Sequence, residues 1–171
     1  MVETGVLDDS ERVELIEGEL LVLNPQGPIH AGLTQELRDV LLVAYGRGYF
    51  ARDHSPVVGT PFTIPEPDIA VVRGEPRALR GRHPGPADVV LVVEISSSSR
   101  RADRRKADVY AQAGFGHYWI VDVERKRTEV RTAPKQGVYL SVEMINFDVA
   151  LALPERPRTI TITIAELLSP T

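Results

Sequence analysis

The chain has 171 residues, of which 43% are apolar and 26% are charged, a balance typical of one soluble globular domain over residues 1–171. No apolar run approaches the roughly 20 residues that a membrane-spanning helix needs, and the acidic N-terminus lacks the layout of a secretory signal. The absence of cysteines excludes disulfides and thiolate metal sites and leads us to expect a cytoplasmic protein. The net charge of −4 argues against a surface coated in basic patches for nucleic acid.

The N-terminal segment is expected to form a short helix and a strand. Asp9 or Ser10 can cap a helix that continues to about residue 16, where Glu17-Gly18 interrupts it. Residues 20–23 have the apolar character of a strand. The Asn-Pro-Gln-Gly-Pro sequence over residues 24–28 is a loop by composition.

A long amphipathic helix is predicted over residues 29–45. Its apolar residues recur at three- and four-residue spacing and therefore share one face of a helix. This stripe consists of Ile29, Leu33, Leu37, Leu41 and Ala44. Gly46 is placed to end the helix.

The next segment mixes short strands with an arginine-rich loop. Strand-like pieces occur at residues 49–51 and 56–58, and an apolar strand over residues 67–72 has Asp68 at its entrance. Residues 73–87 contain too many glycines and prolines for regular structure, so we expect an exposed loop. Its arginines, like those at positions 100–105, have the character of a solvated surface or of a phosphate-binding cluster.

The central strand is predicted over residues 89–95, where apolar residues follow one another without alternation. That pattern suits a strand buried on both faces, in the middle of a sheet that helices cover. A basic helix follows over residues 100–113 and ends at Gly114.

The C-terminal part is expected to be mainly strands. Residues 118–123 and 128–132 flank a polar turn and should form an antiparallel hairpin. Further strands are predicted over residues 138–142 and 160–164, and residues 165–168 have the composition of a closing helical turn. The predicted fold class is therefore α/β (α+β), with a central mixed sheet flanked by helices.

Asp68 and Glu94 are the strongest candidates for chemistry. Each lies at one end of a short apolar strand, where an ionised carboxylate needs a partner or a metal. If the two strands are neighbours, the carboxylates converge and supply the hard oxygen ligands that Mg²⁺ prefers. The alternative is that each one caps a strand end or pairs with an arginine.

Lys106 interrupts the apolar face of the second helix. Val109, Tyr110 and Ala113 follow it at helical spacing, so Lys106 should point towards the sheet rather than away from it. A lysine on a packing face either extends to solvent or finds a carboxylate, and Glu94 directly precedes this helix. Two carboxylates, a cation and a lysine are a suitable set for phosphodiester hydrolysis.

These residues resemble the PD-(D/E)XK nuclease signature. More specifically, the chain resembles the Uma-two family of bacterial endonucleases over residues 14–139. The resemblance rests on VELIEGELL, PDIAVV and LVVEISSSSRRADRRKADVYAQAGFGHYWIVD, followed by a hairpin.

The resemblance implies a restriction-endonuclease-like fold and a divalent-metal site at Asp68 and Glu94, occupied by Mg²⁺ or Mn²⁺. In the parent signature a lysine stands two residues after the second acid, where this chain has Ser96. The family resemblance implies that the lysine has moved to the following helix, as Lys106. Glu14 matches an acid in what the family has as an N-terminal helix, and is either a third acidic contributor or a surface residue.

Other candidates have structural explanations of equal or greater weight. His30 matches a family histidine but could be a helix cap, and Tyr110 could either hydrogen-bond a carboxylate or pack in the core. The serines at positions 96–99 are expected to cap the helix, although a phosphate could bind there. Tyr118 and Trp119 are expected in the core or in a dimer interface.

Three functional hypotheses follow. The first is a Mg²⁺-dependent endonuclease that binds DNA weakly and in a salt-sensitive way, with the arginines at positions 100, 101, 104 and 105 holding phosphates. Such an enzyme would act as a homodimer to cut both strands. The second is an inactive protein of the same fold that binds nucleic acid or protein, which Ser96 supports. The third is a structural or oligomerisation protein.

Overall fold

The computed structural model describes residues 13–23, 26–96, 100–156 and 161–162. The elements are β1 (Val13–Ile16), β2 (Glu19–Val22), α1 (Pro28–Tyr45), β3 (Tyr49–Asp53), β4 (Ile69–Arg73), the 3-10 helix η1 (Pro76–Leu79), β5 (Val89–Ser96), α2 (Arg100–Ala113), β6 (His117–Asp122), β7 (Arg127–Lys135), β8 (Val138–Asn146), β9 (Leu151–Ala152) and β10 (Thr161–Ile162).

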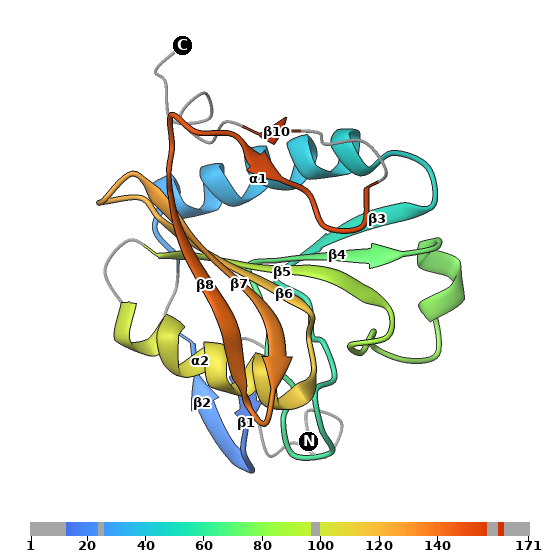
Figure 1. Ribbon diagram of the computed structural model, residues 1–171. Coiled ribbons are helices and arrows are strands. Elements are labelled where there is room, and N and C mark those ends of the chain that lie inside the picture. Colours follow the sequence, from blue (N-terminus) through green and yellow to red (C-terminus); the bar gives the residue numbers. More distant parts are fainter. Residues whose placement is uncertain (1–12, 24–25, 97–99, 157–160, 163–171) are drawn as a thin grey trace.

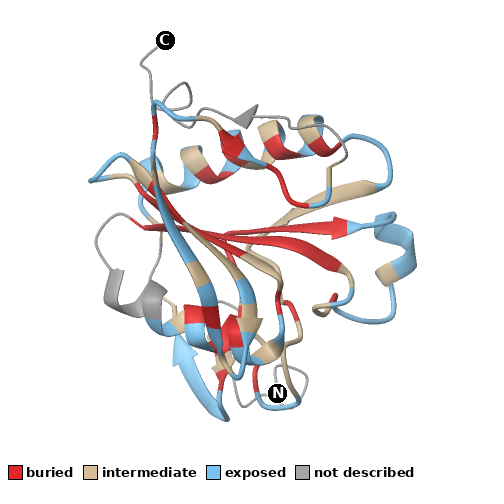
Figure 2. Ribbon diagram, in the orientation of Figure 1, coloured by how far each residue is buried: buried red, intermediate tan, exposed pale blue. Residues whose placement is uncertain are grey.

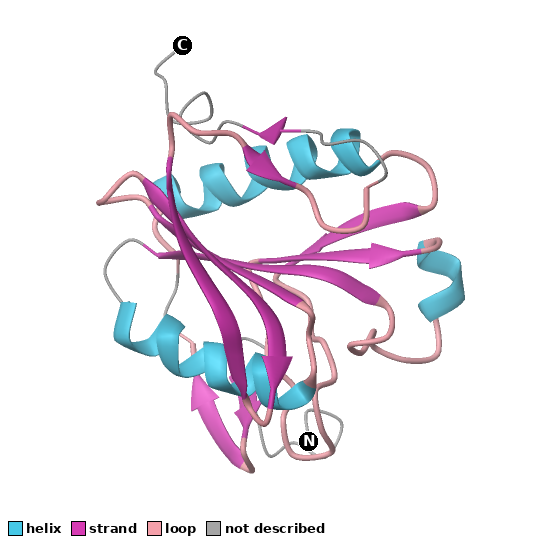
Figure 3. Ribbon diagram, in the orientation of Figure 1, coloured by secondary structure: helices cyan, strands magenta, loops and turns pink. Residues whose placement is uncertain are grey.

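The centre of the fold is a six-stranded mixed sheet in the order β3-β4-β5-β6-β7-β8. Strands β5 and β6 run parallel, joined by α2 as the crossover, and the other neighbours in this sheet are antiparallel. Helices α1 and α2 cover opposite faces of the sheet (Figures 1 and 3). This arrangement confirms the predicted mixed α/β fold.

The middle of the sheet is buried on both faces, as the unbroken apolar run in the sequence predicts. All eight residues of β5 are buried, and so are the first four residues of β4 (Figure 2). Side chains alternate between the two faces of a strand, so β5 contributes to the cores beneath both helices. The two core clusters lie on opposite sides of the same central strands.

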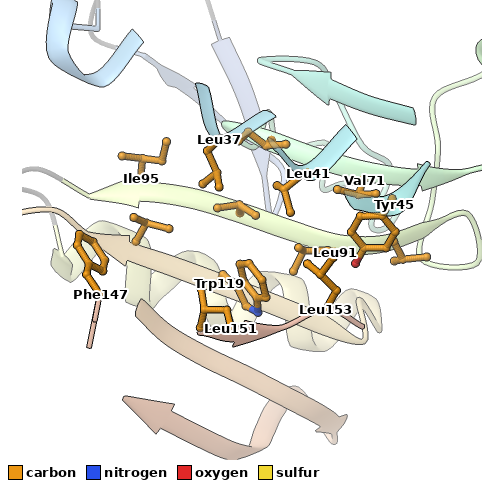
Figure 4. Close-up of a cluster of buried hydrophobic side chains, with 14 residues drawn as sticks. Leu37, Leu41, Tyr45, Val71, Leu91, Ile95, Trp119, Phe147, Leu151 and Leu153 are labelled. Atoms are coloured by element: carbon orange, nitrogen blue, oxygen red, sulfur yellow. The ribbon is translucent and has the colours of Figure 1, made fainter. Parts of the chain in front are cut away.

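Helix α1 contributes Leu37, Leu41 and Tyr45 to the first core, where they contact residues of the central strands and Trp119 (Figure 4). Helix α2 contributes Ala107, Tyr110 and Ala111 to the second core, which includes Tyr118. Tyr118 and Trp119 are both buried, which places these aromatic residues in the core.

The prediction of a helix that ends at about residue 16 is wrong for residues 13–16. These residues form strand β1, which pairs with β2. Glu17 and Gly18 both have positive φ, of 51° and 86°, and form the two-residue turn of a β-hairpin rather than a helix end. Glu14 and Ile16 share the buried face of β1. A carboxylate at one of these inward positions hides the alternation that would have indicated a strand.

Smaller differences also have local causes. The segment 56–58 is not a strand, although Val57 and Val58 donate backbone hydrogen bonds to the loops around them. Ile29 is 75% exposed, so the buried face of α1 begins at Thr34 instead. The arginine-rich loop is exposed as predicted but contains η1. The predicted helical turn at residues 165–168 lies outside the described residues.

Candidate active site

Strand register brings the two predicted carboxylates to the same place. In the antiparallel pair β4–β5, Ile69 pairs with Val93, so the next step of this register sets Asp68 opposite Glu94. Side chains opposite each other in an antiparallel pair point to the same face, with β-carbons about 5 Å apart. Asp68 also accepts a 2.7 Å hydrogen bond from the backbone N–H of Ile95. The charge of Asp68 also raises the pKa of Glu94, so the two carboxylates lie near each other, one just before β4 and the other near the end of β5.

The first half of the site is the lysine network, consisting of Glu14, Glu94, Lys106 and Tyr110. Lys106 Nζ donates to Glu14 Oε1 at 2.8 Å and to Glu94 Oε1 at 3.1 Å. Tyr110 Oη donates to the same Glu94 oxygen at 2.9 Å. The prediction that Lys106 points towards Glu94 agrees with these contacts, and the network also includes Glu14.

Two separate elements position this network against β5. Lys106 and Tyr110 are one helical turn apart on α2, so both side chains reach the sheet from the same face of the helix. Glu14 comes from β1, and its Oε1 also accepts a 2.9 Å hydrogen bond from the backbone N–H of Glu66. The β1–β2 hairpin lies beside α2 (Figure 1). This hairpin places the Glu14 carboxylate in the lysine network, where its side chain is only 1% exposed.

Burial dominates the electrostatics of the lysine network. Burial raises the pKa of Glu94 to about 8, against the attraction of Lys106, and the charges of Asp68 and Glu14 raise this pKa further. Burial would lower the pKa of Lys106, but Glu94 and Glu14 outweigh this effect and raise it above its ordinary value. Burial and the charge of Glu94 raise the pKa of Tyr110, which keeps this residue a hydrogen-bond donor.

The second half of the site is the aspartate network, consisting of Gln26, His30, His54 and Asp68. Gln26 Nε2 donates to Asp68 Oδ1 at 3.0 Å, and His30 Nε2 lies 3.1 Å from Asp68 Oδ2. His54 Nδ1 lies 3.6 Å from Asp68 Oδ1 and 3.1 Å from Gln26 Nε2. Both oxygens of Asp68 thus have partners on the protein.

His30 is oriented by more than one contact. Its Nε2 is also 2.9 Å from the carbonyl oxygen of Ile95, and Thr34 Oγ1 donates to the His30 backbone carbonyl at 2.8 Å. The side chain therefore faces the sheet from the first turn of α1, where the sequence suggested either a cap or a functional group. Its contacts are those of a residue that holds the Asp68 carboxylate.

Gln26 and His54 were not predicted from the sequence. Gln26 lies in a proline- and glycine-flanked loop, a context without any helical or strand period. His54 directly follows β3, the strand that pairs with β4, and its backbone N–H donates to the Asp68 carbonyl. A correct prediction of the strand order would have placed His54 beside Asp68.

The described serine and arginine candidates lie around the site without contacting the carboxylates. Ser96, at the position where the parent signature has lysine, is buried at the end of β5, and its Oγ has no hydrogen-bond partner in the described part of the chain. Arg105 is exposed. The serines at positions 97–99 and the side chains of the arginines at positions 100, 101 and 104 lie outside the described structure.

The donor chemistry fits a hard divalent cation at Asp68 and Glu94. Mg²⁺ is commonly held by one or two carboxylates, with waters and substrate phosphate completing its octahedron. Among the described residues, no group of three or more His, Asp or Glu side chains forms a ready-made metal cage. The two adjacent carboxylates therefore match a cation that keeps several waters better than one enclosed by protein ligands.

Comparisons with known proteins give a family for the sequence and a similar fold among solved structures. The family Uma2, described as "Putative restriction endonuclease", matches residues 4–165. A solved structure from Anabaena variabilis, described as "a putative nuclease belonging to DUF820", is similar over 96% of this chain and 94% of that one. Its TM-score is 0.74 and its sequence identity is 19%.

No curated protein sequence matches the chain significantly. Within the described ranges, no helix combines the length and the apolar character that crossing a membrane requires. The family match covers nearly the whole chain, and the similarity to the solved structure extends over almost the full length of both chains. The chain therefore belongs to the Uma2 family, described as "Putative restriction endonuclease".

Proposed function

We propose that the protein is a divalent-cation-dependent endonuclease that hydrolyses phosphodiester bonds in DNA. Asp68 and Glu94 would hold Mg²⁺ or Mn²⁺, which polarises a phosphate and lowers the pKa of a bound water. In the overall reaction a water oxygen attacks phosphorus, a bridging P–O bond breaks, and the departing oxygen takes up a proton. The observation that carries the proposal is the contact of Lys106 with Glu94, because it brings a cationic side chain to the predicted site although Ser96 replaces the usual lysine.

The protein residues have distinct roles in this proposal. Lys106 places a positive charge beside the attacked phosphate and orients the water. Glu14 fixes the Lys106 ammonium, while Tyr110 and Lys106 fix Glu94 through Oε1. The described contacts of Glu94 all involve Oε1, so Oε2 is the oxygen that the proposal assigns to the cation. The aspartate network orients Asp68 in the same way.

The proposal extends to the whole chain and its partners. Residues 1–171 act as one domain, in the cytoplasm, and the protein binds DNA weakly because the net charge is −4. Cutting both strands of a duplex calls for two active sites, so we propose a homodimer. Sedimentation of the protein with and without DNA measures this stoichiometry.

Nicking of supercoiled plasmid DNA tests the function. We expect nicking with Mg²⁺ or Mn²⁺ and none with EDTA, and a loss of at least about 100-fold in Asp68→Asn, Glu94→Gln and Lys106→Met. Asp39→Asn is the matched control, because Asp39 is an exposed acid whose described partner is Arg38. If the three site variants nick DNA as fast as the parent, the assignment of the active site is wrong.

The second candidate function is an inactive protein of this fold that binds nucleic acid or protein. It is favoured by the observation that both oxygens of Asp68 already have protein partners. This reading predicts DNA binding without nicking under any divalent cation, and no calorimetric Mg²⁺ binding that Asp68→Asn removes. Metal binding that depends on Asp68 would exclude it.

A further inference from the structure

A pocket of about 680 Å³ lies between strand β3 and the loop that contains η1. One wall is formed by β3, with Phe50 and Arg52. The other is formed by Leu79, Arg80 and the residues that follow. Its volume is in the range of pockets that hold small organic ligands. We call it the arginine pocket.

The arginine pocket opens on the same face of the sheet as the active site. Arg52 pairs with Ala70, and Ala70 pairs with Val92, and the side chains of Ala70 and Val92 belong to the core under α2. Phe50, two residues from Arg52, packs against this same core. Because alternate residues share a face, Arg52 lies on the face that carries Glu94.

Strand geometry also sets the distance between the two sites. Asp68 directly precedes β4 and lies two residues before Ala70, the partner of Arg52, which is a step of about 7 Å along the chain. Asp53 and Ser55 line the pocket and flank His54, which belongs to the aspartate network.

Two of the pocket's guanidinium groups have no acidic partner among the described residues. Arg82 is paired with Asp88 at 2.6 Å, and Asp53 is paired with Arg38 at 3.2 Å. In contrast, the side chains of Arg52 and Arg80 have no hydrogen bond or ion pair with any described residue. Arg52 is half-buried, and burial lowers its pKa. A desolvated cation without a counter-ion costs stability, which a bound anion would offset.

We propose that the arginine pocket binds a phosphate of the DNA strand near the bond that is cut, through Arg52 and Arg80. The apolar side chains of Phe50 and Leu79 form a wall against which the adjoining sugar or base packs. This inference rests on the proposed nuclease function. It adds a positioning site that fixes the register of the strand relative to Asp68 and Glu94.

DNA binding in EDTA tests this pocket without any need for cleavage. Fluorescence anisotropy of a labelled DNA oligonucleotide should show about tenfold weaker binding for Arg52→Gln and for Arg80→Gln. The slope of log affinity against log salt should become shallower by about 1 for each variant. Arg77→Gln is the matched control, because Arg77 is on η1, is paired with Glu75 and does not line the pocket. It should bind within about twofold of the parent.

Two further measurements make the result specific. One uncharged methylphosphonate linkage can be placed at successive positions of the DNA strand. At one of these positions the linkage should weaken binding to the parent protein, and at that position it should not weaken binding to Arg52→Gln. Arg52→Gln should melt no lower than the parent, because it removes a desolvated cation that has no partner. Arg80 is exposed, so Arg80→Gln tests the pocket even if Arg52→Gln fails to fold.

The outcomes separate the pocket from the nuclease function. If DNA is not nicked but binding is lost in Arg52→Gln and Arg80→Gln alone, the pocket stands and the nuclease function fails. If nicking depends on Asp68 and Glu94 while Arg80→Gln binds and cuts like the parent, the pocket is overturned and the nuclease function stands. Absence of DNA binding by the parent also overturns the pocket.

Discussion

The two halves of the candidate site hold their carboxylates by different means. In the lysine network, one ammonium group lies between the buried carboxylates of Glu14 and Glu94. In the aspartate network, one carboxylate is surrounded by an amide side chain, a backbone N–H and two imidazoles. The first arrangement depends on a single charge, whereas the second distributes its stabilisation over several donors. Loss of one member should therefore damage the lysine network more.

The largest effect is expected when Lys106 is replaced. Lys106→Met should lower the free energy of unfolding by about 3 kcal/mol, because it leaves the buried carboxylate of Glu14 without a counter-ion. Urea denaturation at neutral pH measures this loss. The double variant Glu14→Gln with Lys106→Met should regain part of the stability. Equal stability of Lys106→Met and the parent would show that the network is not held by charge.

The pH dependence of stability should reveal Glu94. Its folded-state pKa is raised from 4.5 to about 8, so between these values the folded state holds a proton that the unfolded chain has lost. The associated stability is complete below about pH 4.5 and is lost as the pH rises through about 8. Without divalent cation, the parent should therefore lose stability across this range relative to Glu94→Gln. Parallel pH profiles of the two proteins would contradict the raised pKa.

Removal of one hydroxyl should have an intermediate effect. Tyr110→Phe deletes the 2.9 Å hydrogen bond to Glu94 but keeps the buried ring, so we expect a loss of about 1.5 kcal/mol. Tyr139→Phe is the comparison variant, because the Tyr139 hydroxyl donates to a neutral backbone carbonyl and should contribute less. Chemical denaturation of both variants above about pH 8, where Glu94 is ionised in the folded state, measures the difference. The opposite order would mean that Glu94 is not charged when it accepts this bond.

The smallest effect is expected in the aspartate network. His30→Gln should cost about 1 kcal/mol or less, since Asp68 keeps its bonds to the Ile95 N–H and to Gln26. The same denaturation measurement, compared with that of Lys106→Met, tests whether stabilisation is distributed on this side. If His30→Gln is as unstable as Lys106→Met, both halves depend on single contacts.

The sequence predicted the parts of the fold in which apolar residues follow a clear pattern. The unbroken apolar run of β5 and the helical spacing in α2 indicated the central strand, the crossover and the inward position of Lys106. The hairpin of β1 and β2 was missed because Glu14 occupies an inward position and obscures the alternation. Glu14, to which the proposed function assigns a role, is therefore also the residue that obscures the strand pattern of β1.

The predicted site was incomplete for a different reason. Asp68 and Glu94 were expected to converge only if their strands are neighbours, a condition that the pairing of β4 with β5 meets. Gln26 and His54 come from a loop and from the end of an edge strand, where no period exists to show which way a side chain points. Their contacts with Asp68 depend on the tertiary placement of α1 and β3, which composition and spacing do not encode.

The separation in sequence between Glu14 and Lys106 has a consequence during synthesis. These two residues are 92 positions apart, so their contact closes a long loop and requires most of the chain to be present. A growing chain contains Glu14 and Glu94 before it contains the lysine that pairs with both. The lysine network therefore becomes complete only when α2 docks on the sheet, after most of the chain has been synthesised.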